Sequence, residues 1–139
     1  MVSVDCIFCK IVTGIIPCAR IFEIDTILAF MDIAFVQPGH ALVIPKGHYP
    51  TLLDLPTGLG IDLLAAQQTV ARAVQIVTHA DGFNLNMNNF EAAGQLVPHA
   101  HFHIIPRHLG DGFKPWTQTP YSSPDTMHIL AAAIRNAIV

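Results

Sequence analysis

Apolar residues recur along the chain with two different periods, and this separates predicted strands from predicted helices. The segments with the alternating or continuously apolar pattern of β-strands are residues 19–25, 26–32, 41–45, 82–88 and 99–106. The first two segments meet at Asp25 and Thr26, which is typical of a β-hairpin.

Between Pro56 and His79 the period becomes that of an α-helix. Its apolar residues fall within about 60° on a helical wheel, namely Leu59, Leu63, Val70, Val74 and Val77. Two shorter helices are predicted, one over residues 7–14 that ends at Gly14 and one over residues 125–139 that is capped by Ser123 or Asp125. About five strands with one long helix, a short N-terminal helix and a C-terminal helix indicate an α+β fold with a mainly antiparallel sheet.

Length and charge narrow the class of protein. The chain fits one domain over residues 1–139, with a core in residues 6–107 and a polar tail and helix in residues 108–139. A net charge of −3 without a cluster of Lys or Arg argues against nucleic acid or an anionic membrane as a partner. No apolar run approaches the roughly 20 residues that span a bilayer. The first ten residues lack the basic region of a secretory signal, so we expect a cytoplasmic protein.

Three histidines occupy alternate positions in the last predicted strand. His99, His101 and His103 are expected to share one face of that strand at intervals of roughly 6.5–7 Å. One interpretation is a polar stripe that faces solvent. A second is a metal site, because two imidazoles of a His-x-His pair can bind one zinc ion. A third is nucleophilic attack on phosphorus by an imidazole. The periodicity alone leaves the last two open.

The sequence around these histidines resembles a known family. The stretch GQLVPHAHFHIIPR, residues 94–107, follows the segments ILAFMDI, PGHALVIPKGH and NNFEAAG in that order. In this combination the chain resembles the histidine-triad (HIT) family of nucleotide hydrolases and transferases, from Cys6 to about Arg107. The resemblance implies a HIT-like fold and a reaction at the α-phosphate of a nucleotide.

The resemblance also implies a role for each histidine. In the family, the middle histidine attacks the α-phosphorus and forms a covalent nucleotidyl-histidine that water then hydrolyses; that position is His101. The backbone carbonyl of His99 would orient the attacking ring, and His103 would contact phosphate oxygens. A fourth family histidine, ahead of the LVIP strand, maps to His40.

The family's nucleotide pocket maps onto apolar and polar residues in several segments. Its expected lining consists of Ile7, Phe8, Ile11, Phe30, Asp32 and Ile33 around the nucleoside, and of Asn88 and Gln95 near the phosphate or leaving group. An apolar slot suits a base, and the Asp32 carboxylate suits the hydroxyls of a ribose. Ordinary core packing is the alternative for the apolar members. One residue departs from the family pattern, because Leu96 stands where relatives commonly carry Ser or Thr.

Two cysteines form a Cys6-x-x-Cys9 motif. Two ligands do not make a zinc site, and buried thiols are the alternative. The motif resembles that of bacterial family members, which bind structural zinc through both cysteines, the PKxH histidine and the first triad histidine. Those positions are Cys6, Cys9, His48 and His99, a set that would close the coordination shell of the metal.

The leading hypothesis is therefore a hydrolase of nucleoside phosphoramidates or dinucleoside polyphosphates that acts on purine nucleotides. The alternatives are a purine-nucleotide-binding regulatory or interaction protein with incidental turnover, and a hydrolase with catalytic zinc on the triad. We also expect a homodimer. An edge strand over residues 82–88 and the long helix would join the two copies, as is common in HIT proteins of this size.

Overall fold

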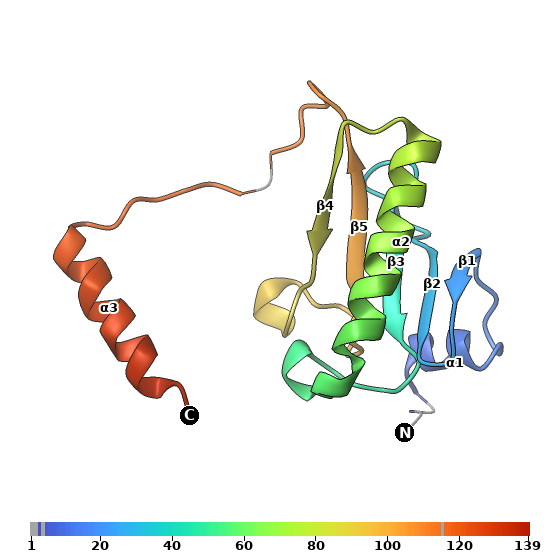
Figure 1. Cartoon of the computed structure of the whole chain (residues 1–139), viewed down its shortest axis with the longest axis horizontal. Helices are drawn as coiled ribbons and strands as arrows, with labels where there is room; N and C mark the ends of the chain where they lie inside the picture. The colour runs from blue at the N-terminus through green and yellow to red at the C-terminus, as the bar shows by residue number, and fades with distance from the viewer. Residues whose placement is uncertain (1–2, 4, 115) are drawn as a thin grey trace.

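The computed structural model describes residues 3, 5–114 and 116–139. Its centre is a five-stranded sheet in which every neighbouring pair of strands is antiparallel (Figure 1). The strands are β1 (Arg20–Glu23), β2 (Ile27–Met31), β3 (Ala41–Pro45), β4 (Gly82–Asn86) and β5 (Phe102–Arg107), in the spatial order β1-β2-β3-β5-β4. The predicted α+β class and the antiparallel sheet are confirmed.

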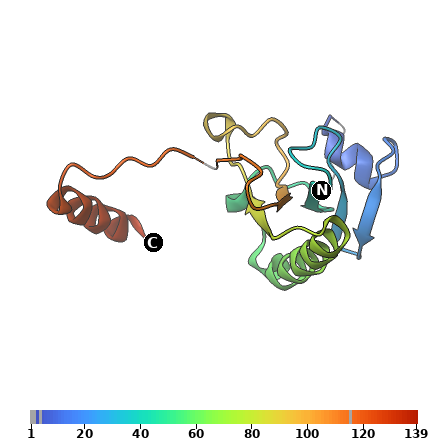
Figure 2. The ribbon, with the colours of Figure 1, turned by 90° about the horizontal axis from the view of Figure 1, so that it is seen from above.

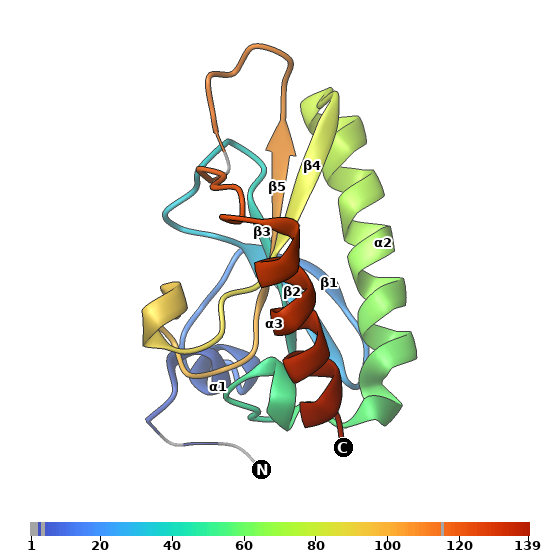
Figure 3. The ribbon, with the colours of Figure 1, turned by 90° about the vertical axis from the view of Figure 1, so that its left-hand side faces the viewer.

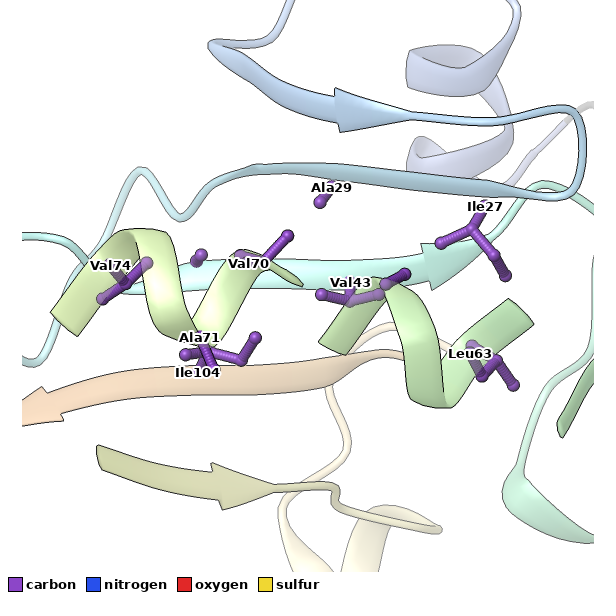
Figure 4. Packing of buried hydrophobic residues seen from close by; sticks show 10 residues of the cluster. Ile27, Ala29, Val43, Leu63, Val70, Ala71, Val74 and Ile104 are labelled. Carbon is purple, nitrogen blue, oxygen red and sulfur yellow. The ribbon is translucent and has the colours of Figure 1, made fainter. Parts of the chain in front are cut away.

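One face of the sheet is covered by the long helix α2 (Gly60–Thr78), as Figure 2 shows from above. The core between them is built from apolar side chains of both layers (Figure 4), namely Ile27, Ala29, Ala41, Val43, Leu63, Ala66, Val70, Ala71, Val74 and Ile104. Val77, which the helical wheel places on the buried face, is 77% exposed. It lies in the last turn of α2, and Ala66 and Ala71 complete the buried face instead.

The opposite face of the sheet packs against the short helix α1 (Ile7–Val12). Because successive strand residues point to opposite faces, Leu28 and Phe30 lie on this side while their neighbours Ile27 and Ala29 face α2. This second apolar cluster is made of Cys6, Phe8, Cys9, Ile11, Leu28, Phe30, Leu42 and Ile44. The central strands β2 and β3 are therefore buried on both faces, and α1 is held against them.

The strand predicted over residues 99–106 is shorter at its start. β5 begins at Phe102, and residues 99–101 approach it without strand pairing. The Ala100 amide donates to the carbonyl of Tyr49 at 2.6 Å, and the His99 amide donates to the carbonyl of Val97 at 2.8 Å. These local bonds replace the strand ladder. The three triad histidines consequently do not form one evenly spaced stripe on a strand.

The predicted edge strand is confirmed, because β4 pairs on one side only, with β5. The sequence pattern places its apolar side chains in the core, but Phe83 is 43% exposed and Leu85 is 46% exposed. The physical reason is that the core helix α2 packs mainly over the central strands, and its buried side chains do not reach over these two residues. An apolar strip is left at the free edge of the sheet.

The C-terminal helix α3 (Pro124–Ala137) begins at Ser123, whose hydroxyl accepts from the Thr126 amide at 3.2 Å. An extended segment carries this helix away from the sheet, as Figures 1 and 2 show from two directions; it overlaps the sheet only in the projection of Figure 3. None of its residues is buried. Among the described helices, none is both long and apolar enough to cross a membrane.

Candidate functional site

A cavity of about 510 Å³ opens on the face of the sheet opposite α2. Its wall contains nearly all of the residues that the sequence predicts for nucleotide binding, namely Ile7, Phe8, Ile11, Phe30, Asp32, Ile33 and Asn88. His101 and His103 lie in the same wall, and Leu96 does too. The cavity falls within the size range of small-molecule sites in proteins.

Gln95 is the predicted residue that does not line the cavity. Its side-chain amide donates to the carbonyls of Pro50 at 2.6 Å and Val97 at 3.1 Å, and its oxygen accepts from the Phe90 amide at 2.7 Å. The hydrogen-bonding groups of Gln95 thus hold the loop ahead of the histidines together. The third bond also supports Phe90, which has a left-handed φ of 68° that is rare for a non-glycine residue.

Several cavity residues were not predicted from the sequence. They are Ile16, Pro17, Cys18, Met31, Ala34, Leu42, Gly94 and Val97. Ile16 to Cys18 form an irregular apolar segment directly after α1, without the periodicity of a helix or a strand. The signal in the sequence that could have identified them is an apolar but irregular segment next to a helix that was predicted to line the pocket.

His101 is held by the backbone of His99. The Nδ1–H of His101 donates to the carbonyl oxygen of His99 at 2.6 Å. A carbonyl only accepts, so Nδ1 carries a proton, and in the neutral form of the ring the lone pair lies on Nε2. The ring also lies edge-on to Phe8, with 5.2 Å between centroids. An imidazole in this state is a nucleophile with a fixed direction.

His40 and His103 form a pair beside Asp32. The His40 Nε2 and His103 Nδ1 atoms are 2.8 Å apart, and the Asp32 Oδ2 atom is 3.5 Å from the former and 3.9 Å from the latter. His40 reaches this position from the start of β3 because Gly39 makes the preceding turn with φ 98°. A Cβ atom there would lie 2.5 Å from Thr78 Cγ2, which excludes other residues.

Burial lowers the pKa of three of the histidines around the site, His40, His99 and His103. Desolvation, with His101 and His40 close by, lowers the pKa of His103 to about 4. Desolvation also lowers the pKa of His40, although the Asp32 carboxylate opposes this shift. The pKa of His99 falls to about 4, again chiefly through burial. These histidines are therefore neutral donors and acceptors near pH 7.

Outside the cavity lining, the predicted metal ligands Cys6, Cys9, His48 and His99 converge, with all four donor atoms within 4.8 Å of one another. The His99 Nδ1 atom is 3.5 Å from Cys6 Sγ, 3.7 Å from Cys9 Sγ and 3.4 Å from His48 Nδ1. Tetrahedral zinc would place N and S ligands roughly 3.6 Å apart and two N ligands roughly 3.4 Å apart. The spacing of the donor atoms fits a tetrahedral metal ion.

The protonation of His99 also fits a metal ligand. Its Nε2 lies 2.8 Å from the carbonyl oxygen of Pro45, so Nε2 carries the proton and Nδ1 turns its lone pair toward the two thiols. A metal-binding histidine is usually oriented in this way by a second hydrogen bond. Cys18, the remaining cysteine, lies outside this cluster. The imidazole of His99 thus belongs to the metal cluster, while His101 and His103 face the cavity.

Comparisons with known proteins agree with this site. The HIT domain family matches residues 13–110. The adenosine 5′-monophosphoramidase hnt1 of Schizosaccharomyces pombe is 40% identical over 139 residues, which cover 96% of this chain and 98% of that protein. The adenylylsulfatase HINT3 of Arabidopsis thaliana is 43% identical over 103 residues, which cover 74% of this chain; the chain spans about half (52%) of that protein.

Solved structures show the same fold. A Streptococcus mutans protein superposes with a TM-score of 0.92 at 40% identity, covering 99% of this chain and 87% of that one. A zinc-bound histidine-triad protein from Mycobacterium smegmatis superposes with a TM-score of 0.75 at 37% identity, covering 96% of this chain and 95% of that one. With its triad, its cavity and these matches, the chain belongs to the histidine-triad (HIT) family.

Proposed function

We propose that this protein hydrolyses purine nucleotides at the α-phosphate, with His101 as the nucleophile. The observation that carries the proposal is the hydrogen bond from His101 Nδ1 to the His99 carbonyl, because it leaves the Nε2 lone pair free on a ring in the cavity wall. Two relatives bear the names of nucleotide hydrolases, a monophosphoramidase and an adenylylsulfatase. Membership of the HIT family supports the same class of reaction.

The walls of the cavity support a nucleotide as the substrate. Its apolar lining includes Phe8, Ile11 and Phe30, which suits a flat purine base. Asp32 lies in the same wall, and its carboxylate suits the hydroxyls of a ribose. His103, beside His101, and Asn88 supply polar groups to the lining, and the phosphate would sit against His101.

The reaction would proceed in two displacements. His101 Nε2 attacks the α-phosphorus, an N–P bond forms, and the bond from phosphorus to the leaving amine or phosphate breaks. The leaving group departs with a proton from solvent or a neighbouring donor. Water then attacks the same phosphorus, releases the nucleoside monophosphate and restores neutral His101. Fixed donors around the phosphoryl oxygens stabilise both transition states.

Trapping the intermediate tests this proposal. Adenosine 5′-phosphoramidate or a diadenosine polyphosphate is mixed with the protein, quenched in denaturant within one turnover, and examined by intact mass spectrometry. We expect an adenylyl adduct that maps to His101 and is absent from His101→Ala. Turnover without any adduct in the quenched samples would contradict the covalent mechanism, and absence of turnover would favour a nucleotide-binding regulatory protein.

We further propose that the four-ligand cluster holds structural zinc. Two thiolates and two imidazoles are typical ligands of structural zinc, and their spacing leaves no coordination position open. The zinc-bound Mycobacterium smegmatis relative supports this choice of metal. Bound metal would hold α1, which carries Cys9, against the loops that carry His48 and His99.

A homodimer is the third proposal. The free edge of β4 and its exposed Phe83 and Leu85 would be covered by a second copy. Trp116 is 72% exposed, and the segment that follows it holds α3 apart from the sheet of its own chain (Figure 1). Both features suit association with a second copy.

A further inference from the structure

The hydrogen bonds around His40 determine where its proton lies. The backbone N–H of Val36 donates to His40 Nδ1 at 3.1 Å. An amide N–H only donates, so Nδ1 of His40 carries the lone pair. A neutral imidazole has one proton, and that proton must therefore be on Nε2. Burial, with 3% of the His40 side chain exposed, favours this neutral form.

The proton on His40 in turn fixes the proton on His103. His40 Nε2 and His103 Nδ1 are 2.8 Å apart, so they are hydrogen-bonded. Because His40 Nε2 is the donor, His103 Nδ1 is the acceptor and carries no proton. A neutral His103 then has its proton on Nε2, which is the ring nitrogen not engaged by His40. His103 lines the cavity beside His101, with 5.0 Å between ring centroids.

We propose that His40 is a positioning residue that holds His103 as a neutral Nε2–H donor, with the Val36 amide as the anchor of the chain. This inference rests on the proposed function only in that the Nε2–H group would meet a phosphoryl oxygen or the leaving-group atom. If His103 were an imidazolium, its Nδ1–H would point at the Nε2–H of His40 across 2.8 Å. His103 therefore acts by a directed hydrogen bond and not by a positive charge.

The other groups around His103 agree with this assignment. Asp32, His40 and His101 are the titratable side chains beside it. The Asp32 carboxylate is 3.9 Å from Nδ1, too far for a hydrogen bond that would draw a proton to that nitrogen. The depressed pKa of His103 is consistent with a ring that stays neutral near pH 7.

The positions of the imidazole protons also distinguish the group Asp32, His40 and His103 from the candidate metal ligands around His99. Asp32, His40 and His103 have donor atoms close enough to suggest a second metal site. Metal binding at His40 Nε2 would displace its proton to Nδ1, where it would collide with the Val36 N–H. At His99 the carbonyl of Pro45 holds the proton on the far nitrogen and leaves the inner one free. The cluster at His99 fits a metal ion, whereas the trio fits a hydrogen-bond chain.

Nitrogen-15 NMR of the zinc-loaded protein without substrate tests the chain directly, because protonated and unprotonated imidazole nitrogens resonate in separate regions. We expect His103 to carry its proton on Nε2 in the wild type. In His40→Ala the proton should distribute over both nitrogens, and His40→Gln, which keeps a donor to Nδ1, should restore the Nε2–H form. The exposed His128→Ala should change nothing. A wild-type proton on Nδ1, or an unchanged tautomer in His40→Ala, would overturn the proposal.

Val36→Pro gives an independent variant, because it deletes the anchoring N–H and leaves His40 in place. We expect the tautomer of His103 to become mixed in this variant. Phe35→Pro is the matched control, since the Phe35 amide makes no hydrogen bond among the described residues. A mixed tautomer in both proline variants would assign the effect to loop distortion and overturn the role of the amide.

Kinetics with adenosine 5′-phosphoramidate connects the tautomer to turnover. In His40→Ala, kcat should fall about tenfold to a hundredfold while KM stays within about threefold, and His40→Gln should recover much of the loss. An unchanged kcat in His40→Ala would contradict a positioning role. If the wild type shows no turnover at all, the proposed function fails, and the NMR result alone decides the tautomer.

Discussion

His101 and His99 are joined by a hydrogen bond of 2.6 Å from a ring nitrogen to a backbone carbonyl, while the ring of His99 lies in the Cys6, Cys9 and His48 cluster. One residue thus contacts both the candidate metal ligands and the candidate nucleophile. A metal ion that fixes the His99 ring would also restrict the His99 backbone and with it the direction of His101 Nε2. The occupancy of the metal site is therefore expected to affect catalysis without any contact between metal and substrate.

Loss of the metal should lower both stability and turnover. Elemental analysis of the purified protein should give about one zinc per chain. Cys9→Ser should lose the metal and unfold at a lower temperature, because metal binding contributes directly to folding. Its kcat should fall about ten- to a hundredfold through misorientation of His101. The measurements are zinc content, thermal unfolding and steady-state kinetics.

Cys18→Ser is the matched control, because it makes the same Cys-to-Ser change at a cysteine that lies outside the cluster. It should retain zinc and the unfolding temperature of the wild type, and these are its readouts because Cys18 also lines the cavity. Equal turnover in zinc-free and zinc-loaded wild type would show that His99 holds His101 without the metal. Protein purified without chelators that contains no zinc would contradict the structural-metal proposal itself.

His101→Ala should abolish turnover and leave nucleotide binding within about tenfold, because the base and ribose contact other residues of the cavity. Binding of adenosine monophosphate by calorimetry and turnover of the phosphoramidate are the two measurements. His79→Ala, at the end of α2 on the far side of the sheet, is the control. Full activity of His101→Ala would exclude His101 as the nucleophile.

The sequence predicts the strands and the convergence of the histidines well, because the strands follow from local pattern and the histidines from the family motif; the role of each histidine stays a prediction. The hairpin, β3 and α2 follow from the spacing of apolar residues, and every predicted metal ligand lies in the observed cluster. The start of β5 was predicted three residues early. Apolar alternation continues through Ala100, and only the tertiary bond from its amide to Tyr49 ends the pairing.

Long-range polar contacts were beyond sequence reasoning. Nothing in the pattern around Val36 indicates that its amide meets His40, because that contact depends on how the loop folds back. The bonds of Gln95 to Pro50 and Val97 depend likewise on segments far apart in the chain or on an irregular turn. The family motif identifies these residues as a group but does not give the atom that each one contacts.

Leu96→Ser should raise turnover of substrates with poor leaving groups. Leu96 is 91% exposed in the cavity wall, so a hydroxyl there can donate to the leaving-group atom at little cost in stability. The gain is at most about one or two powers of ten, and good leaving groups should respond little. Leu109→Ser, 88% exposed outside the cavity, is the control. An unchanged or lower rate with poor leaving groups would assign Leu96 to packing against the substrate.

The stability of the protein should fall as the pH drops through the window between 6.5 and about 4. The pKa of His103 lies near 6.5 when unfolded and at about 4 when folded, so the unfolded chain takes up the proton first. Stability from His103 is complete above pH 6.5 and is lost toward pH 4, by at most about 3 kcal/mol.

Urea unfolding of wild type and His103→Gln at several pH values isolates this contribution. The variant should lose less stability on acidification, while His128→Gln should follow the wild type. Both variants keep the four predicted metal ligands, so acid release of a metal affects all three proteins alike. Parallel curves for wild type and His103→Gln would show that His103 protonates equally in both states.

The chain is predicted to be a homodimer that buries the free edge of β4. An edge strand with unpaired backbone groups and exposed Phe83 and Leu85 is a surface that a two-fold partner can cover. Light scattering at micromolar concentration should therefore give about twice the 15.1 kDa mass of one chain. Leu85→Arg places a charge on this edge and should shift the mass toward 15.1 kDa, because a buried unpaired charge opposes association.

Ile15→Arg is the control for the added charge. Ile15 is 73% exposed in the connection from α1 to β1, and β1 is the edge strand opposite to β4, so its variant should remain dimeric. A wild-type mass of 15.1 kDa would refute the dimer. If the Leu85→Arg variant remains a dimer, the interface does not lie at β4. The exposed apolar residues of α3, among them Leu130 and Ile134, would then be the next surface to substitute, because α3 also lies apart from its own sheet.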